Sequence, residues 1–161
     1  MSLASFVRTV QPAVDAELRR VVMDSLPEPY AELQAMLCYH MGWEGETSNV
    51  EAQGKRIRPL LVLLSTAACG GDWKAALPAA AAVELLHNFS LIHDDVEDQS
   101  HLRRGRATLW SRWGSALAIN AGDAMFSLAN LAILRLLETA SVDIAIQAAA
   151  ILQQTCLHLT G

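Results

Sequence analysis

An apolar stretch that ends in a cluster of acidic residues is the feature that most constrains how this chain folds. The stretch from Ala76 to Ile92 reads as a buried helix, and Asp94, Asp95 and Asp98 follow it closely. On a helix, Asp94 and Asp98 lie one turn apart on the same face. Carboxylates crowded near a helix C-terminus repel one another and face the negative end of the helix dipole. This arrangement opposes stability unless a multivalent cation lies between the carboxylates.

The acidic cluster is followed by two adjacent arginines, Arg103 and Arg104. Oxygen ligands at this spacing suit Mg²⁺, or Mn²⁺ in its place, because Mg²⁺ takes one or two carboxylates and completes its shell with water and substrate phosphate. Guanidinium groups match the geometry of phosphate oxygens. An acidic triplet by itself often does no more than solvate a helix end. The long apolar helix before it and the arginines after it favour Mg²⁺-mediated capture of a diphosphate.

A second basic motif precedes the apolar stretch. Lys55, Arg56 and Arg58 lie between Gly54 and Pro59, where a polar segment meets the expected start of a helix. Three cations at a helix N-terminus, which already favours anions, make a phosphate cradle. Read in isolation, the same residues are equally compatible with a solvated charge cluster.

His87 lies within the apolar stretch itself. Counting 100° per residue, His87, Asp94 and Asp98 fall within about 40° of one another on the long helix. A histidine on an apolar helix is more often a core residue than a ligand. Because this one shares a stripe with the expected cation site, it is a candidate donor to a second phosphate group.

The bulk properties are those of one apolar domain. The chain has 161 residues, 52% of them hydrophobic, with a formal net charge of −5 and a mean hydropathy of +0.24. The length suffices for a single core. We expect no membrane span, because Glu84 and His87 interrupt the longest apolar run. The negative charge argues against nucleic acid as a partner.

Three cysteines, Cys38, Cys69 and Cys156, are widely spaced and set in apolar sequence. They have neither metal-binding nor disulfide spacing, so we expect buried, reduced thiols. The N-terminus lacks the basic and apolar regions of a secretory signal. These features favour a cytoplasmic protein.

Every periodic segment shows helical spacing, and we find no alternating strand pattern, so the predicted fold is all-α. Helices are predicted over Val10–Met23, Tyr30–Met41, Ile57–Ala68, Trp73–Ser100, Ser115–Glu138 and Val142–Leu159. Loops are predicted over Gly42–Gly54 and Leu102–Ala107. Thr108 is expected to cap a short helix that ends at Trp113, before Gly114.

Taken together, these motifs resemble those of the trans-isoprenyl diphosphate synthases, the polyprenyl synthetase family. The resemblance covers the chain from about residue 50 onward and rests on the segments Gly54–Pro59, Glu84–His87, Ser90–Asp98, Leu102–Gly105 and Asn120–Phe126. The segments occur in order and with family spacing, and their conjunction is highly specific. One departure is Ala107, where the family usually has proline.

The resemblance implies a helical bundle that condenses isopentenyl diphosphate with an allylic diphosphate after ionisation of the allylic partner. It assigns catalytic roles to Asp94, Asp95, Asp98 and Arg103. Asp94 and Asp98 would bind the Mg²⁺ that holds the allylic diphosphate, with Asp95 in support, and Arg103 would contact the same diphosphate. The diphosphate of isopentenyl diphosphate would be held by four residues: Lys55, Arg58, His87 and Arg104.

The resemblance also bears on product length and on assembly. In the family, a bulky residue five positions before the first aspartate tends to close the product pocket early. That residue is Phe89 here, followed by the small Ser90, so we expect a product of twenty carbons, or next fifteen. The alternative is that Phe89 only packs in the core. The helices at 115–138 and 142–159 match those that form the family's homodimer.

The chain is much shorter than the resembling family's domain and lacks its second aspartate-rich motif. We therefore interpret residues 1–161 as the N-terminal half of a single synthase domain, inactive by itself. Two alternatives stay open. One is a non-catalytic helical partner subunit or relic of a synthase. The other is a fragment of a class I terpene cyclase, which would not need the second diphosphate site that the Gly54–Pro59 motif predicts.

Overall fold

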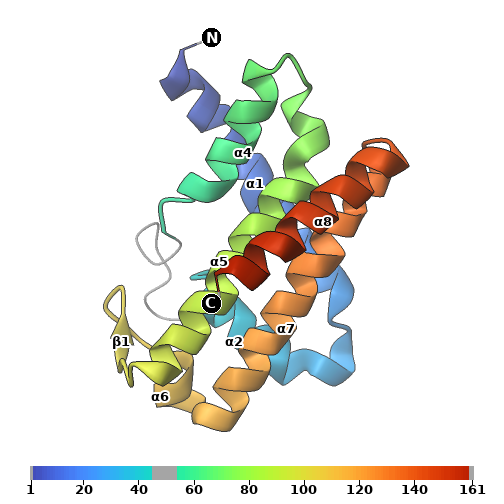
Figure 1. The fold of residues 1–161 in the computed structure, drawn as a ribbon. Coiled ribbons are helices and arrows are strands. Elements are labelled where there is room, and N and C mark those ends of the chain that lie inside the picture. Colours follow the sequence, from blue (N-terminus) through green and yellow to red (C-terminus); the bar gives the residue numbers. More distant parts are fainter. Residues whose placement is uncertain (1, 45–53, 160–161) are drawn as a thin grey trace.

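A computed structural model describes residues 2–44 and 54–159 and shows an all-α bundle, as the sequence predicts (Figure 1). The α-helices are α1 (Leu3–Ser25), α2 (Ala31–His40), α4 (Ile57–Ala68), α5 (Leu77–Glu97), α6 (Leu109–Trp113), α7 (Ser115–Leu134) and α8 (Val142–His158). Short 3₁₀ turns are η1 (Glu28–Tyr30), η2 (Trp73–Ala76) and η3 (Arg135–Glu138). Most of the predicted Gly42–Gly54 loop lies outside the described residues.

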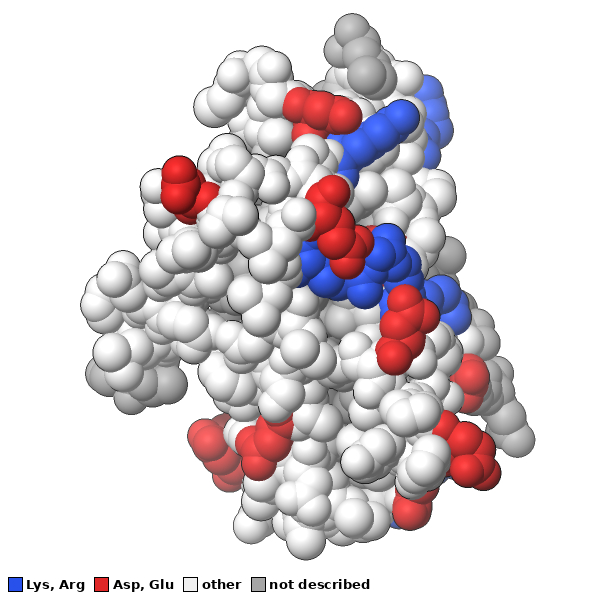
Figure 2. Space-filling model, turned by 90° about the vertical axis from the view of Figure 1, so that its right-hand side faces the viewer, with Lys and Arg blue, Asp and Glu red and all other residues white. Residues whose placement is uncertain are grey.

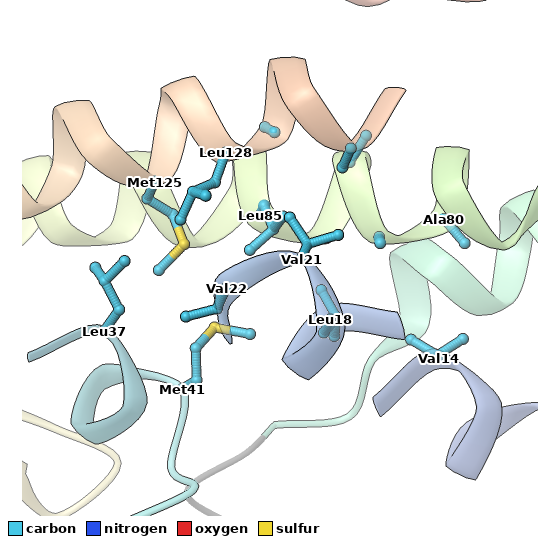
Figure 3. Packing of buried hydrophobic residues seen from close by; sticks show 14 of the residues in the cluster. Val14, Leu18, Val21, Val22, Leu37, Met41, Ala80, Leu85, Met125 and Leu128 are labelled. Atoms are coloured by element: carbon cyan, nitrogen blue, oxygen red, sulfur yellow. The ribbon is translucent and has the colours of Figure 1, made fainter. Parts of the chain in front are cut away.

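α5 and α7 lie side by side along the middle of the molecule, and α8 crosses over them (Figure 1). Gly122 makes the close approach of α5 and α7 possible, because a methyl group at that position would overlap the ring of His93. α1 and α2 close the other side of the core. Figure 3 shows the residues that meet there: Val14, Leu18, Val21 and Val22 from α1, Leu37 and Met41 from α2 and its end, Ala80 and Leu85 from α5, and Met125 and Leu128 from α7.

α1 begins earlier than the sequence predicts. The Ser2 hydroxyl accepts a hydrogen bond from the amide of Ser5 and caps the helix, which then continues through Pro12. Phe6 and Val10 extend the buried stripe by one more turn at helical spacing. The predicted start at Val10 is therefore wrong by about two turns. The long helix predicted from Trp73 to Ser100 is also shorter, since its first turn is 3₁₀ and α5 ends at Glu97.

The predicted loop after the aspartates contains a two-residue β-hairpin, in which β1 (Leu102–Arg103) pairs antiparallel with β2 (Arg106–Ala107). Arg104 and Gly105 form its turn with φ angles of 52° and 75°. Positive φ at both positions gives the primed turn that two-residue hairpins favour. Thr108 stands at the N-cap of α6 but does not cap it, because its hydroxyl donates to the carbonyl oxygen of Ser100 at 2.8 Å.

Of two sequence expectations about apolar residues, the absence of a membrane span stays unconfirmed and the burial of the cysteines needs correction. The segments Trp73–Glu97 and Ser115–Glu138, with mean hydropathies of 1.4 and 1.5, are long and apolar enough to cross a membrane by length and composition. Core helices of water-soluble proteins pass the same test, and both segments pack in the bundle here. Of the cysteines, Cys38 is buried as expected, Cys156 is half-buried and Cys69 is exposed.

Candidate functional site

A basic pocket opens between the start of α4 and the middle of α5. Its cavity volume is about 560 Å³. The structure brings together in it all four residues assigned to the second diphosphate: Lys55, Arg58, His87 and Arg104. Gln11, Gly54, Arg56, Ile57 and Glu84 complete the described lining. What the pocket binds stays a prediction, but its charge suits a multiply charged anion.

The backbone at position 54 favours glycine. Its φ of +78° lies in the left-handed region, and a Cβ there would come within 2.6–2.7 Å of the Arg104 guanidinium group. The Arg104 side chain, which comes from the hairpin turn, therefore packs closely against Gly54, the residue before Lys55. The two segments lie far apart in the sequence. Burial lowers the pKa of Arg104 below its ordinary value, and the nearby charge of Arg56 lowers it further.

His87 lies in the pocket wall, and its surroundings shift its pKa. Burial lowers its pKa from the ordinary value, and the charge of Arg58 lowers it further, while Glu84 opposes the shift. The imidazole is therefore neutral near pH 7. A diphosphate in the pocket would favour the protonated form, since an adjacent anion stabilises the cation.

Arg56 is oriented differently from Lys55 and Arg58, the other two cations of its motif. Its guanidinium group turns into the protein, where Nη1 donates to Glu84 Oε1 at 2.7 Å. Lys55 and Arg58, in contrast, are exposed. Within this motif, Lys55 and Arg58 therefore face solvent, whereas Arg56 faces the protein interior.

The three aspartates also divide. Asp94 and Asp98 are exposed at the end of α5, whereas the Asp95 side chain is 3% exposed and forms an ion pair with Arg103. Arg103 Nε lies 2.9 and 3.0 Å from the two carboxylate oxygens, and Nη2 lies 2.9 Å from Oδ1. The pair fastens the hairpin to α5. Arg103, predicted to contact the allylic diphosphate, is thus held in place by Asp95.

The exposed pair fits a cation that brings its own remaining ligands. Asp94 and Asp98 supply two carboxylates on one face, while no group of three or more candidate ligands gathers anywhere in residues 2–44 and 54–159. Mg²⁺ accepts such a partial site because it keeps water and substrate phosphate in its shell. The donor set therefore fits Mg²⁺ bound together with a diphosphate and not a closed structural metal site.

A small cavity of about 20 Å³ lies behind the hairpin, between Asp95, Arg103, Arg104 and His40. Nε2 of His40 is buried and has no hydrogen-bond partner among the described residues. Burial lowers the pKa of His40 to about 3, and the charges of Arg103 and Arg104 contribute to the shift. The volume accommodates one water molecule with polar neighbours. Arg104 lines both this cavity and the basic pocket.

Phe89, the predicted determinant of product length, lies between α5 and α7. Its ring centroid is 5.1 Å from that of Phe126 and 4.8 Å from that of His93. The hydroxyl of Ser90 donates to the carbonyl oxygen of His87 at 2.9 Å. This geometry shows Phe89 in an aromatic cluster and leaves its role in product length a prediction.

The sequence motifs gave no role to several residues that shape this site. Asn88 binds Glu84 within α5, and Tyr39 donates from its hydroxyl to the Ala107 carbonyl oxygen at 3.0 Å. In the sequence, one feature could have pointed to some of these residues. Glu84 and Asn88 are polar residues in an otherwise apolar helix, and buried polar groups are paired.

The fold and the pocket together define a helical protein with a basic pocket and an acidic helix end. A model of the polyprenyl synthetase family matches residues 46–160, and the chain belongs to that family.

Relatives agree with this assignment. The chain is 44% identical over 140 residues to a geranylgeranyl diphosphate synthase of Mycobacterium tuberculosis, covering 85% of this chain and 38% of that protein. It is 35% identical over 159 residues to a short chain isoprenyl diphosphate synthase of Methanothermobacter thermautotrophicus, covering 99% of this chain and 44% of that one.

Solved structures show the same fold. A crystal structure of a polyprenyl synthetase from Streptomyces coelicolor superposes with a TM-score of 0.80 at 36% identity, over 95% of this chain and 44% of the other. The chain therefore spans less than half the length of these relatives.

Proposed function

We propose that this chain is part of an enzyme that condenses isopentenyl diphosphate with an allylic diphosphate, giving a short trans-prenyl diphosphate of twenty or fifteen carbons. Family membership supports the reaction class. Relatives named as geranylgeranyl and farnesyl diphosphate synthases support the short product. The observation that carries the proposal is the pocket that gathers Lys55, Arg58, His87 and Arg104.

In this proposal the basic pocket holds the diphosphate of isopentenyl diphosphate. Lys55, Arg58 and Arg104 supply permanent positive charge, and His87 can add a proton when the anion binds. Charge-assisted hydrogen bonds to phosphate are strong and directional. The pocket would therefore fix the substrate by its diphosphate and leave its terminal double bond to attack the allylic cation.

The allylic diphosphate would lie at the end of α5. Asp94 and Asp98 would hold Mg²⁺, whose charge stabilises the departing diphosphate as the allylic carbon ionises. Arg103, oriented by its bond to buried Asp95, would contact the same leaving group. Asp95 thus acts through Arg103, not as a metal ligand.

We also propose that residues 1–161 form the N-terminal half of one synthase domain and pair with a second copy. Much of the surface in Figure 2 belongs to uncharged residues. α7, η3, α8 and its last turn carry many exposed apolar side chains, namely Leu117, Ile119, Leu131, Leu134, Leu137, Val142, Ile144, Ile146, Ile151, Leu157 and Leu159. Monomers rarely expose contiguous apolar patches beyond a few hundred Å². A homodimer through 115–138 and 142–159 would cover part of this surface, and the rest of the domain would cover another part.

Two alternative functions are less well supported. A class I terpene cyclase needs the acidic motif but has no use for a second diphosphate pocket. A relic or non-catalytic partner subunit has no need of a pocket that keeps four predicted ligands together.

The test is a condensation assay with radiolabelled isopentenyl diphosphate and an allylic diphosphate, with and without Mg²⁺. The complete protein, whatever length it has, should form product only with the metal. The 161-residue chain alone should form none and should scatter light as a species larger than a monomer. A monodisperse species of 17.4 kDa that turned over substrate would contradict the half-domain proposal.

A further inference from the structure

Arg56 differs from the two cations beside it in the same motif. Its side chain is 4% exposed, and it contacts three other segments of the chain. Nη1 donates to Glu84 Oε1 on α5 at 2.7 Å, Nε lies 3.5 Å from Asp15 Oδ1 on α1, and Nη2 lies 3.5 Å from the carbonyl oxygen of Met41. One guanidinium group thus joins the start of α4 to α1, α5 and the end of α2.

The backbone at Arg56 is strained. Its φ of 47° and ψ of 39° lie in the left-handed region, directly before the first residue of α4. A non-glycine residue stays in that region only where the surroundings determine it. The buried ion pair supplies that determination. Because the turn lies between Lys55 and Arg58, its conformation sets where both of those side chains start.

Glu84 is itself held in place. Asn88, one turn further along α5, donates from Nδ2 to the Glu84 carbonyl oxygen at 2.8 Å and to its Oε1 at 3.2 Å. Glu84, Asn88 and Arg56 are all buried. Glu84 also precedes His87 by one turn on the same helix. The carboxylate that fixes the Arg56 turn therefore belongs to the wall that carries His87.

A carboxylate in this wall opposes anion binding if only its charge is counted. Glu84 is the single acidic residue in the described lining of the basic pocket. A negative charge there repels a diphosphate and favours its dissociation. Its presence makes sense if the carboxylate improves the placement of the cations by more than its charge repels the ligand.

We propose that Arg56 and Glu84 are positioning residues for the diphosphate pocket, an inference that rests on the proposed function. They do not bind the diphosphate. Their ion pair holds the left-handed turn so that Lys55 and Arg58 converge with His87 and Arg104 on one anion.

The direction of the change in diphosphate affinity distinguishes a positioning role of Glu84 from simple charge repulsion between its carboxylate and the ligand. Inorganic diphosphate is titrated into the full chain by calorimetry, without metal, for the native protein and for Glu84→Gln. Glutamine keeps the length of the side chain but removes its charge, so it weakens the ion pair that holds the Arg56 turn. Positioning predicts binding about fivefold to tenfold weaker. Unchanged or tighter binding, as charge removal alone would give, overturns the inference.

Matched variants keep the result interpretable. Glu32→Gln removes an exposed charge on α2 and should leave the affinity unchanged. Lys55→Ala should weaken binding directly. Combined with Glu84→Gln, it should remove most of the additional effect of Glu84, because a turn that no longer carries Lys55 has less to position. Fully additive losses of affinity would show that Glu84 acts independently of Lys55 and would overturn the inference.

Two further results would be interpreted as follows: a Glu84→Gln variant that does not fold, and a failure of the proposed function itself. If Glu84→Gln does not fold, Asp15→Asn changes the more exposed end of the same network. It should give a smaller loss, about twofold to threefold, and an unchanged affinity would again overturn the inference. If Lys55→Ala leaves diphosphate binding unchanged, the proposed function of the pocket fails, whatever Glu84→Gln does.

Discussion

The two charged ends of the site are built differently. In the basic pocket, Gly54 packs against Arg104, and buried Arg56 anchors the loop between Lys55 and Arg58. At the end of α5, Asp94 and Asp98 are exposed, and the described residues supply no third ligand near them. The first region is organised by the fold. In our proposal the second becomes a site only when a cation and a substrate bind there.

This difference has a thermodynamic reason. Cations around the pocket repel one another, and in our proposal the Arg56–Glu84 pair and the hairpin hold them in place before an anion binds. Carboxylates at a helix C-terminus have the same repulsion and also face the helix dipole. The charge of Asp95 is compensated by its ion pair with Arg103. The charges of Asp94 and Asp98 would be compensated only when a metal binds.

The largest expected effect is on catalysis at the acidic end. In the complete enzyme, Asp94→Ala should lower turnover by orders of magnitude, because it removes a ligand of the ion that stabilises the leaving group. Steady-state kinetics at saturating Mg²⁺ measure this effect. Near-normal turnover by the variant would remove the acidic end from the mechanism.

The division of labour between the two ends should appear in the substrate constants. Lys55→Ala and Arg104→Ala should mainly weaken isopentenyl diphosphate, and Arg103→Ala mainly the allylic partner. Each lost phosphate contact should cost about 1.5–3 kcal/mol. Apparent constants measured for both substrates check this. Equal increases for both substrates in all three variants would show that the two ends are not separate sites.

The aspartates should also differ in what they do for stability. Asp95→Asn leaves Arg103 without its buried partner and should lower the free energy of unfolding by about 2 kcal/mol, discounted because Arg103 is partly exposed. Asp94→Asn should change it by less than about 0.5 kcal/mol. Urea unfolding of the two variants makes the comparison. Similar values would mean that the Asp95–Arg103 pair does not fasten the hairpin.

Acid should weaken the region behind the hairpin through His40, whose pKa is lowered to about 3. Between pH 6.5 and 3 the unfolded chain binds a proton that the folded chain does not, so stability is lost as the pH falls. At pH 5 the loss should be about 2 kcal/mol. Urea unfolding at pH 7 and pH 5 should show this loss in the native chain and in His101→Gln, whose histidine is exposed, and less of it in His40→Gln. Equal losses in both variants would contradict the assignment.

The smallest expected effect concerns product length. Phe89→Ala should shift the complete enzyme toward longer products, because it opens the aromatic cluster with Phe126. Chromatography of the dephosphorylated products measures the distribution. An unchanged distribution would show that Phe89 only packs between α5 and α7.

Much of this site followed from local sequence pattern. The apolar period located α5, and the spacing of Asp94 and Asp98 placed them on one face. The inward orientation of the Arg56 side chain could not be predicted, because it depends on ion pairs with Asp15 and Glu84, which lie far away in the sequence. The same holds for Asp95, whose burial is set by a hairpin that two-residue strands are too short to signal.

The most direct test of this account is a titration of the chain with inorganic diphosphate in the absence of metal. A pocket organised by the fold predicts measurable binding that Lys55→Ala weakens strongly and Asp94→Ala leaves unchanged. Binding that needs Mg²⁺, or that Asp94→Ala abolishes as fully as Lys55→Ala, would contradict it.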